Sequence, residues 1–368
     1  MLHRKQYRTA AVVAAVMLAA GMTACGTQSG IKGAESTEKT EIAEVFRETT
    51  ENGNTAEESD GEIKPEIASA AEQEGQTAES GETPAAETNA PQGSLAAGAE
   101  PNQPETSRLQ PVEYTDLQQI TLNPDWEYAD HSKIHTGAAV LYRAPEESGR
   151  KGIVVGVNAG HGTAGGAKVK TLCHPDGSAK TTGGSTAAGA TEAAAVSGGM
   201  TFQDGTPERT VTLRMAQILR DKLLAAGYDV LMLRDDEDVQ LDNVARTVIC
   251  NHVADCHISL HWDSGDGKNY DKGCFYISVP EALKSMEPVA SHWQQHDTLG
   301  ADLVEGLREQ GATIYGKGKM SIDLTQTSYS TIPSVDVELG NGYSDHSDTA
   351  LDTLAEGLLS GIQTYFGQ

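Results

Sequence analysis

The chain has 368 residues, and 53 acidic against 27 basic side chains give it a formal net charge of −26 at pH 7. Nucleic-acid binding needs a basic surface, so this balance argues against a nucleic-acid partner. The length that follows residue 152 is enough for one domain with a sizeable hydrophobic core.

The first 25 residues have the pattern of an export signal. A basic start, Arg4 to Arg8, precedes an apolar run, Ala10 to Ala20, that is short for a membrane span. Ala24 and Cys25 follow, in a pattern that resembles a bacterial lipoprotein processing site. We therefore expect Cys25 to carry lipid and to attach the protein to the cell membrane on its extracytoplasmic face. An ordinary secretory signal with an incidental cysteine is the alternative.

Residues 26–110 differ in composition from the rest of the chain. They hold 18 Asp and Glu against 5 Lys and Arg, and Phe46 is their only aromatic residue. Such a segment cannot bury enough apolar surface to offset the entropy lost on ordering. The composition predicts a disordered acidic tether that holds a domain away from the membrane.

Residues 111–151 form a lead-in segment of mixed character. Trp126, Tyr128 and the apolar run at 138–142 predict an ordered region with one short strand. We expect this lead-in to pack on the edge of the main domain, which extends over 152–368.

In the main domain, strand and helix patterns alternate. The predicted helix at Glu208 has Thr206 as N-cap and Pro207 in its first turn, and it ends at Gly227. Strands are expected at 154–159, 228–233, 257–264, 274–279 and 334–340, and further helices near 241–248, 299–307 and 351–362. This order predicts an α/β fold, a three-layer domain with a largely parallel central sheet flanked by helices.

A long segment rich in Gly, Ala, Thr and Ser, about 162–206, separates the first predicted strand from the first helix. A structureless loop of this length is usually functional or disordered. We expect a mobile insertion over the mouth of the site.

Polar residues at the ends of these elements form a candidate zinc site. His161 follows the first strand between two glycines that allow a sharp turn and leave room beside the ring. Glu208 begins a helix, and His261 lies near the end of a later strand. Residues just past the carboxyl ends of strands face the ligand crevice of an open α/β sheet. Two histidines and a glutamate are a common catalytic zinc set, and Glu338 at the end of the last strand is available as a general base.

Each of these residues also has a structural interpretation. Glu208 could complement a helix dipole, His261 could be a hydrogen-bonded core histidine, and Glu338 could form an ion pair. The expectation that one crevice collects all four favours the catalytic interpretation.

Several motifs occur together in this region and in a characteristic order. They are Val157–Gly162, Glu208 with its helix, Arg234 with Asn243–Arg246, Asn251–His261 and Pro333–Gly340. With these motifs, residues 152–366 resemble the zinc-dependent N-acetylmuramoyl-L-alanine amidases of the amidase 3 group, which cleave bacterial cell walls. The segment between His161 and Glu208 is longer than is usual in that family.

The resemblance implies that His161, Glu208 and His261 bind Zn²⁺ and that Glu338 is the catalytic residue. The implied reaction is hydrolysis of the peptidoglycan amide bond between N-acetylmuramic acid and L-alanine of the stem peptide, by zinc-activated water. Glu192 is a competing choice for the second ligand, and we prefer Glu208 because a helix start holds a ligand more precisely than a flexible loop. The interpretation leaves room for a regulatory protein partner.

Two other functions are compatible with the same residues. One is a non-catalytic cell-wall binding or regulatory lipoprotein with an amidase-like fold, and the other is a different zinc peptidase that acts on stem peptides. A second metal site at His252 and His257 with Cys250 and Cys256 is disfavoured, because their spacing matches no strong zinc pattern. The domain has four cysteines, an even number, and an exported chain permits their pairing in disulfides; they are Cys173, Cys250, Cys256 and Cys274. His292, His296 and His346 are expected at the surface.

Overall fold

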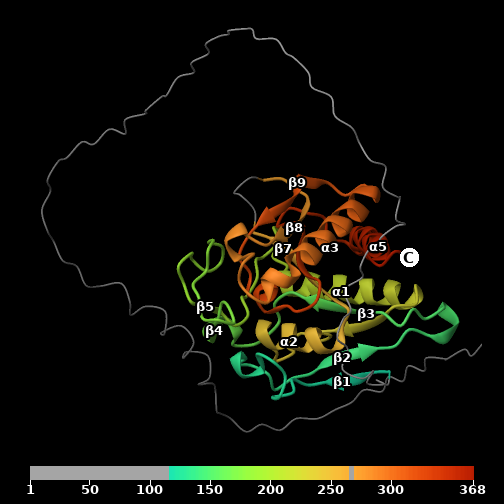
Figure 1. Cartoon of the computed structure of the whole chain (residues 1–368). Coiled ribbons are helices and arrows are strands. Elements are labelled where there is room, and N and C mark those ends of the chain that lie inside the picture. Colours follow the sequence, from blue (N-terminus) through green and yellow to red (C-terminus); the bar gives the residue numbers. More distant parts are fainter. Residues whose placement is uncertain (1–115, 265–268) are drawn as a thin grey trace, which may run out of the picture. The chain divides into compact units, whose positions relative to one another are not determined.

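The computed structural model describes residues 116–264 and 269–368 (Figure 1). The predicted export signal, its Cys25, the acidic tether and the start of the lead-in lie outside the described residues. Within the described ranges, no helix is both long enough and apolar enough to cross a bilayer.

One mixed sheet of eight strands forms the centre of the domain, in the order β1-β2-β6-β3-β7-β10-β8-β9. The strands are β1 (Gln118–Ile120), β2 (Ala139–Tyr142), β3 (Val154–Ala159), β6 (Asp229–Met232), β7 (Cys256–Asp263), β8 (Cys274–Ser278), β9 (Ile314–Ser321) and β10 (Ser334–Asn341). The four central strands β6, β3, β7 and β10 run parallel. β1, β2 and β8 pair antiparallel with their inner neighbours, and β9 is parallel to β8. The predicted α/β fold with a largely parallel sheet is confirmed.

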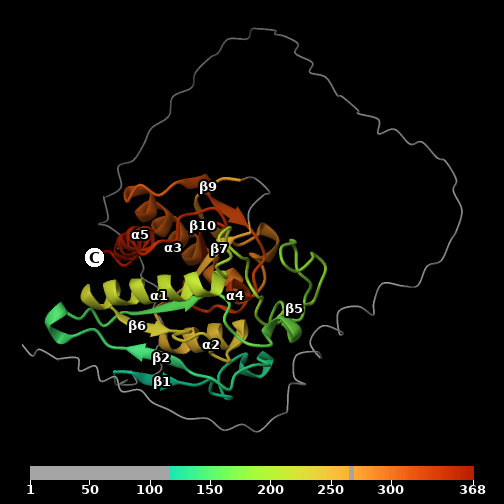
Figure 2. The ribbon, with the colours of Figure 1, turned by 180° about the vertical axis from the view of Figure 1, so that it is seen from behind.

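Helices cover both faces of this sheet (Figure 1 and Figure 2). The helices α1 (Glu208–Ala225), α3 (Val289–Glu309) and α5 (Asp348–Tyr365) share one hydrophobic core with the sheet. The other side carries α2 (Asn243–Val253) and the short α4 (Thr325–Tyr329), which meet in a smaller apolar cluster. One-turn 3₁₀ helices lie at Ala129–His131, Glu146–Ser148, Gly166–Lys168 and Glu281–Leu283.

The two faces of the central strands differ in polarity, because successive side chains of a strand point to opposite faces. Alternate residues of β3, β7 and β10 are apolar and pack into the large core; they are Val155, Val157, Ile258, Leu260, Val335 and Val337. Asn158, Ser259 and Asp336 lie side by side across the opposite face. The core therefore fixes which face of the sheet presents polar groups.

The lead-in packs on the edge of the sheet, as expected. β2 pairs with β6, and β1 adds a second strand outside it, where the sequence predicted only one. The sequence analysis did not predict β9 or α4.

The expectation that 162–206 is structureless was wrong. This segment, which we call the insertion, contains the antiparallel pair β4 (Lys170–Leu172) and β5 (Glu192–Ala194). Backbone hydrogen bonds also tie it to the body, for example from Asn243 N to Ala195 O at 3.0 Å. Small residues allow the chain to pack closely here. Because the segment has no apolar periodicity, its sequence pattern does not indicate strands.

Two further local predictions were wrong. Thr206 does not cap α1: Pro207 precedes its first residue, and no side chain caps the helix. His296 is buried rather than exposed, because its Nδ1 accepts a hydrogen bond of 2.9 Å from the backbone N–H of Ser334.

Candidate metal centre and active site

The turn after β3 presents His161 in a left-handed backbone conformation, with φ at 66°. A Cβ atom at Gly160 would lie 2.3 Å from the ring of His261, and one at Gly162 would lie 2.5 Å from the side chain of Arg234. Only glycine fits at both positions, and the room they leave is filled by the ring of His261 and the side chain of Arg234 rather than by the ring of His161.

Two buried arginines hold this turn from either side. Arg234 donates from Nε to Ala159 O at 3.1 Å and from Nη2 to Gly160 O at 3.0 Å. Arg246 donates from Nη2 to His161 O at 2.7 Å. Burial lowers the pKa of Arg234 to about 10 and that of Arg246 to about 9. The sequence pointed to both residues only as parts of motifs, and the structure shows that they fix the backbone that carries His161.

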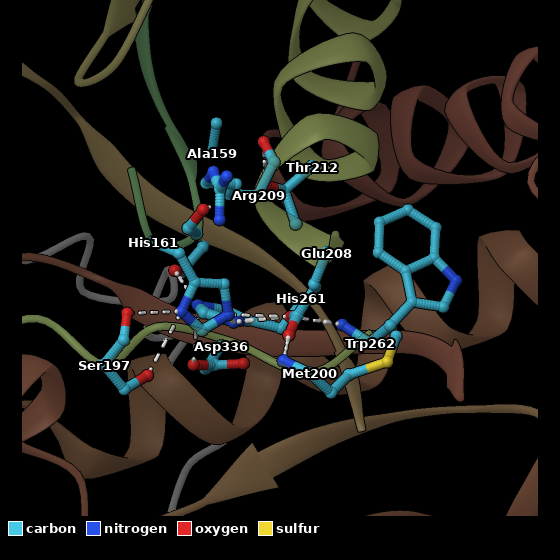
Figure 3. A network of polar contacts seen from close by, with 12 residues as sticks. Ala159, His161, Ser197, Met200, Glu208, Arg209, Thr212, His261, Trp262 and Asp336 are labelled. Atoms are coloured by element: carbon cyan, nitrogen blue, oxygen red, sulfur yellow. Dashed lines mark hydrogen bonds and ion pairs between the residues drawn. The ribbon is translucent and has the colours of Figure 1, made fainter. Parts of the chain in front are cut away.

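His161, Glu208 and His261 meet at the carboxyl edge of the sheet (Figure 3). His161 Nε2 lies 2.9 Å from Glu208 Oε1. His261 Nδ1 lies 3.1 Å from His161 Nε2 and 3.2 Å from Glu208 Oε1. One ligand atom from each residue falls within 4.8 Å of the other two. In the described part of the chain, no other His, Cys, Asp and Glu side chains form such a group.

The insertion helps to orient two of these side chains. His161 Nδ1 faces the backbone oxygen of Ser197 at 3.0 Å, so that Nδ1 carries the proton and Nε2 presents its lone pair to the group. Glu208 Oε2 accepts a hydrogen bond of 2.8 Å from Met200 N, and its Oε1 accepts one of 3.0 Å from Trp262 N. The insertion therefore forms a wall of the site rather than a loop above it.

Glu338 lies next to this group. In the parallel pairing of β10 with β7, Glu338 is directly opposite His261, and Asp336 is opposite Ser259. Glu338 Oε2 and Asp336 Oδ1 are buried without a hydrogen-bond partner. Sequence reasoning missed Asp336, although strand alternation places it on the face of Glu338.

The carboxylates and histidines of the site are compatible with a bound cation. Burial opposes the ionisation of Glu208, but its hydrogen bonds with His161 and His261 lower its pKa. Burial raises the pKa of Glu338 well above its usual range, and the charge of Asp336 raises it further. Asp336 and Glu338 each have one buried oxygen without a hydrogen-bond partner, and a divalent metal nearby would offset negative charge on these side chains. Two imidazole nitrogens and one carboxylate oxygen are donors that suit zinc.

Glu192, the competing ligand, lies elsewhere. It is exposed on β5 and does not belong to the group of three. The geometry therefore favours Glu208 over Glu192 as the glutamate of the group.

His252, His257 and the four cysteines form no second metal-binding group among the described residues, in agreement with the sequence analysis. His252 stacks on Trp126 with ring centroids 4.5 Å apart, and its Nδ1 lies 2.9 Å from Val248 O. His257 is fully buried with neither ring nitrogen partnered. Four free and buried thiols were found among the described residues, so that the permitted disulfide pairing is not seen there; they are Cys173, Cys250, Cys256 and Cys274.

A second buried polar cluster, which we call the insertion cluster, attaches the insertion to the segment before α4. His174 Nε2 lies 2.9 Å from Asp323 Oδ1. Asp323 Oδ2 accepts hydrogen bonds from the backbone N–H and hydroxyl of Thr181, at 2.7 and 3.1 Å. Lys180 donates to the backbone oxygen of Asp323. The insertion cluster fixes the outer part of the insertion on the domain.

Comparisons with known proteins identify a family and several similar solved structures. Residues 155–357 match the family model Amidase_3, described as N-acetylmuramoyl-L-alanine amidase. The solved amidase Ami1 from Mycobacterium smegmatis is similar at 19% identity, over 59% of this chain and 97% of that chain, with a TM-score of 0.49. AmiC2 of Nostoc punctiforme is similar at 17% identity, over 60% and 99% of the two chains, with a TM-score of 0.44.

A comparison with curated proteins gives no match. The family model, however, spans more than half of the chain. The chain therefore belongs to the Amidase_3 family of N-acetylmuramoyl-L-alanine amidases, which hydrolyse peptidoglycan.

Proposed function

We propose that this amidase is a zinc enzyme whose reaction centre is the group His161, Glu208 and His261 together with Glu338. The observation that carries the proposal is the convergence of three ligand atoms within 4.8 Å, each on a side chain oriented by further contacts. Bound there, zinc would lower the pKa of a water molecule and polarise the carbonyl of the amide.

Glu338 is suited to move the proton in this reaction. Its Oε2 is buried and unpartnered, so it is available to accept the proton of the attacking water. The water oxygen attacks the lactyl carbonyl carbon of N-acetylmuramic acid. Because burial and Asp336 favour the protonated form, Glu338 can then donate this proton to the leaving amine of L-alanine.

The rest of the site keeps these groups in place. Arg234 and Arg246 fix the turn of His161, and Met200 N holds Glu208 from the insertion. Such support matters because catalytic groups must be held within about 0.5 Å of their productive positions.

The proposal includes the location of the enzyme. We propose that lipid on Cys25 anchors the chain to the cell membrane on the extracytoplasmic face, and that residues 26–110 give it reach toward the wall. The apolar run before Cys25 and the acidic composition of the tether support this proposal.

The test uses the purified full chain, peptidoglycan and mass spectrometry of the released products, with and without a chelator. We expect chelator-sensitive release of stem peptides with a free N-terminal L-alanine, restored by zinc. Products cut within the stem peptide would indicate the alternative zinc peptidase. No release by zinc-loaded protein would contradict the proposed activity of the isolated chain.

Two glutamate variants separate the candidate ligands. Glu208→Gln should abolish zinc binding and product release, because a neutral amide is a poor substitute for the carboxylate ligand. Glu192→Gln is the matched control and should retain both, because Glu192 is exposed outside the group. The reverse result would show that the insertion supplies the ligand.

A further inference from the structure

The two ring nitrogens of His261 face different surroundings. Nδ1 points toward His161 and Glu208, at 3.1 and 3.2 Å. Nε2 lies 3.1 Å from Ser259 Oγ and 3.6 Å from Asp336 Oδ2. Figure 3 shows Asp336 close to His261. A neutral imidazole that ligates through Nδ1 carries its proton on Nε2, where an acceptor can orient the ring.

Asp336 Oδ2 faces Nε2 at ion-pair distance, 3.6 Å, while Ser259 Oγ is within hydrogen-bond distance at 3.1 Å. Asp336 lies on β10 beside Ser259 of β7, on the same sheet face as Glu338. Its side chain is largely buried, and Oδ1 has no hydrogen-bond partner. Burying a carboxylate is unfavourable because the charge loses its hydration, and apolar burial does not offset this loss. An Asp with a purely structural role at this position would therefore destabilise the fold.

The other two members of the group have their orientation fixed by backbone atoms. Ser197 O holds Nδ1 of His161, and Met200 N holds Oε2 of Glu208. For His261, the corresponding contacts come from the side chains of Ser259 and Asp336. A carboxylate in this position also makes a metal-bound histidine a stronger donor.

We infer that Asp336 is a positioning residue, which orients His261 through Nε2 and strengthens metal binding at Nδ1. This inference rests on the proposed metal site, and it assigns a task to a carboxylate that neither binds the metal nor moves the proton.

The experiment measures the zinc affinity of the full chain by competition with a chromogenic chelator. Asp336→Leu should weaken zinc binding by about 10- to 100-fold, the usual cost of losing a carboxylate that supports a histidine ligand. Asp336→Asn should lose less, because its amide oxygen can face Nε2 as the carboxylate does but lacks the charge.

Thermal unfolding of the metal-free protein separates positioning from a structural role. Asp336→Leu should leave the Tm of the metal-free protein unchanged or raise it, because the variant removes a buried carboxylate beside Glu208 and Glu338. A residue needed only for the fold would instead lower this Tm, and the folded fraction would bind zinc as tightly as the wild type does.

Ser259→Ala and Glu338→Gln are the controls. Ser259→Ala removes the neutral acceptor at Nε2 and should weaken zinc binding less than Asp336→Leu does. Glu338→Gln changes a neighbouring carboxylate that has no hydrogen bond to Nε2 and should weaken zinc binding less than Asp336→Leu does. Wild-type affinity in Asp336→Leu would overturn the inference while the proposed zinc site stands. Failure of the wild type to bind zinc would overturn both.

Discussion

Two buried histidine–carboxylate clusters in this domain differ in how completely their atoms are partnered. His161 Nε2 lies 2.9 Å from Glu208 Oε1 in the candidate site, and His174 Nε2 lies 2.9 Å from Asp323 Oδ1 in the insertion cluster. In the insertion cluster, both carboxylate oxygens have donors. In the candidate site, Glu338 Oε2 has none. The identical pair distance therefore does not distinguish the two clusters, whereas the unpartnered oxygen of Glu338 beside the first one does.

The pKa directions of the central carboxylates express the same contrast. Burial raises the pKa of both Asp323 and Glu338, but hydrogen bonds from His174 and Thr181 bring that of Asp323 below its usual value. The pKa of Glu338 stays well above its usual range. The lowered pKa of Asp323 stabilises its charged form, whereas the raised pKa of Glu338 favours a side chain that accepts and releases a proton.

The largest expected effect is on the rate of the reaction. Glu338→Gln keeps the shape of the side chain and removes its ability to take a proton, so kcat should fall by about 10²- to 10⁴-fold. Zinc content, measured by metal analysis of the same sample, should be unchanged. Full activity in a zinc-loaded variant would show that another group acts as the base.

The insertion cluster should respond in stability instead. Asp323→Ala leaves Lys180 and His174 buried without their carboxylate, and the free energy of unfolding should fall by about 3–5 kcal/mol in denaturant titrations. The folded variant should still bind zinc, since the metal-binding group is separate. Asp348→Ala, which removes an exposed partner of Arg214, is the control and should have a much smaller effect. Loss of zinc binding in the folded Asp323→Ala protein would show that the two clusters are coupled.

Adding metal tests which of the two clusters binds zinc. A ligand that binds only the folded state stabilises it by about 2.7 kcal/mol at 100 times its Kd, so zinc should raise the Tm of the wild type. Asp323→Ala should show the same rise from a lower starting point, and Glu208→Gln should show none. A rise in Glu208→Gln equal to that of the wild type would place the metal elsewhere.

The sequence predicted the candidate site better than its surroundings. His161, Glu208, His261 and Glu338 each lie at the end of a regular element, and the apolar alternation of parallel strands brings such ends to one edge. The insertion cluster joins Thr181 to Asp323, 142 residues apart, and local patterns contain no signal for such a contact.

Weak patterns explain the missed strand and the missed carboxylate. β9 was missed because Gly316 and Gly318 interrupt it and it has little apolar alternation. Asp336 was predictable in principle, since it is two residues from Glu338 on the same strand. An acidic residue amid apolar ones was read there as part of a motif rather than as part of the site.

The smallest expected effect concerns a buried histidine with no partner at all. His257 is fully buried, and burial lowers its pKa to about 3, with a smaller contribution from the charge of Arg246. In the unfolded chain its pKa is about 6.5. Above pH 6.5 His257 is neutral in both the folded and the unfolded state, so the free energy of unfolding keeps its full value there. Between pH 6.5 and pH 3 only the unfolded state takes up this proton, so the free energy of unfolding falls by about 1.4 kcal/mol for each pH unit.

His257→Leu removes this titration and buries no unpartnered nitrogen. Denaturant titrations of the metal-free protein at pH 7 and pH 5 should show that the variant loses less stability than the wild type on acidification. The buried His296, whose pKa burial also lowers to about 3, remains in both proteins, so the variant keeps part of the acid sensitivity. Parallel losses in the two proteins would mean that His257 finds a partner for its proton in the folded state. The distinction between partnered and unpartnered buried histidines would then no longer predict their behaviour.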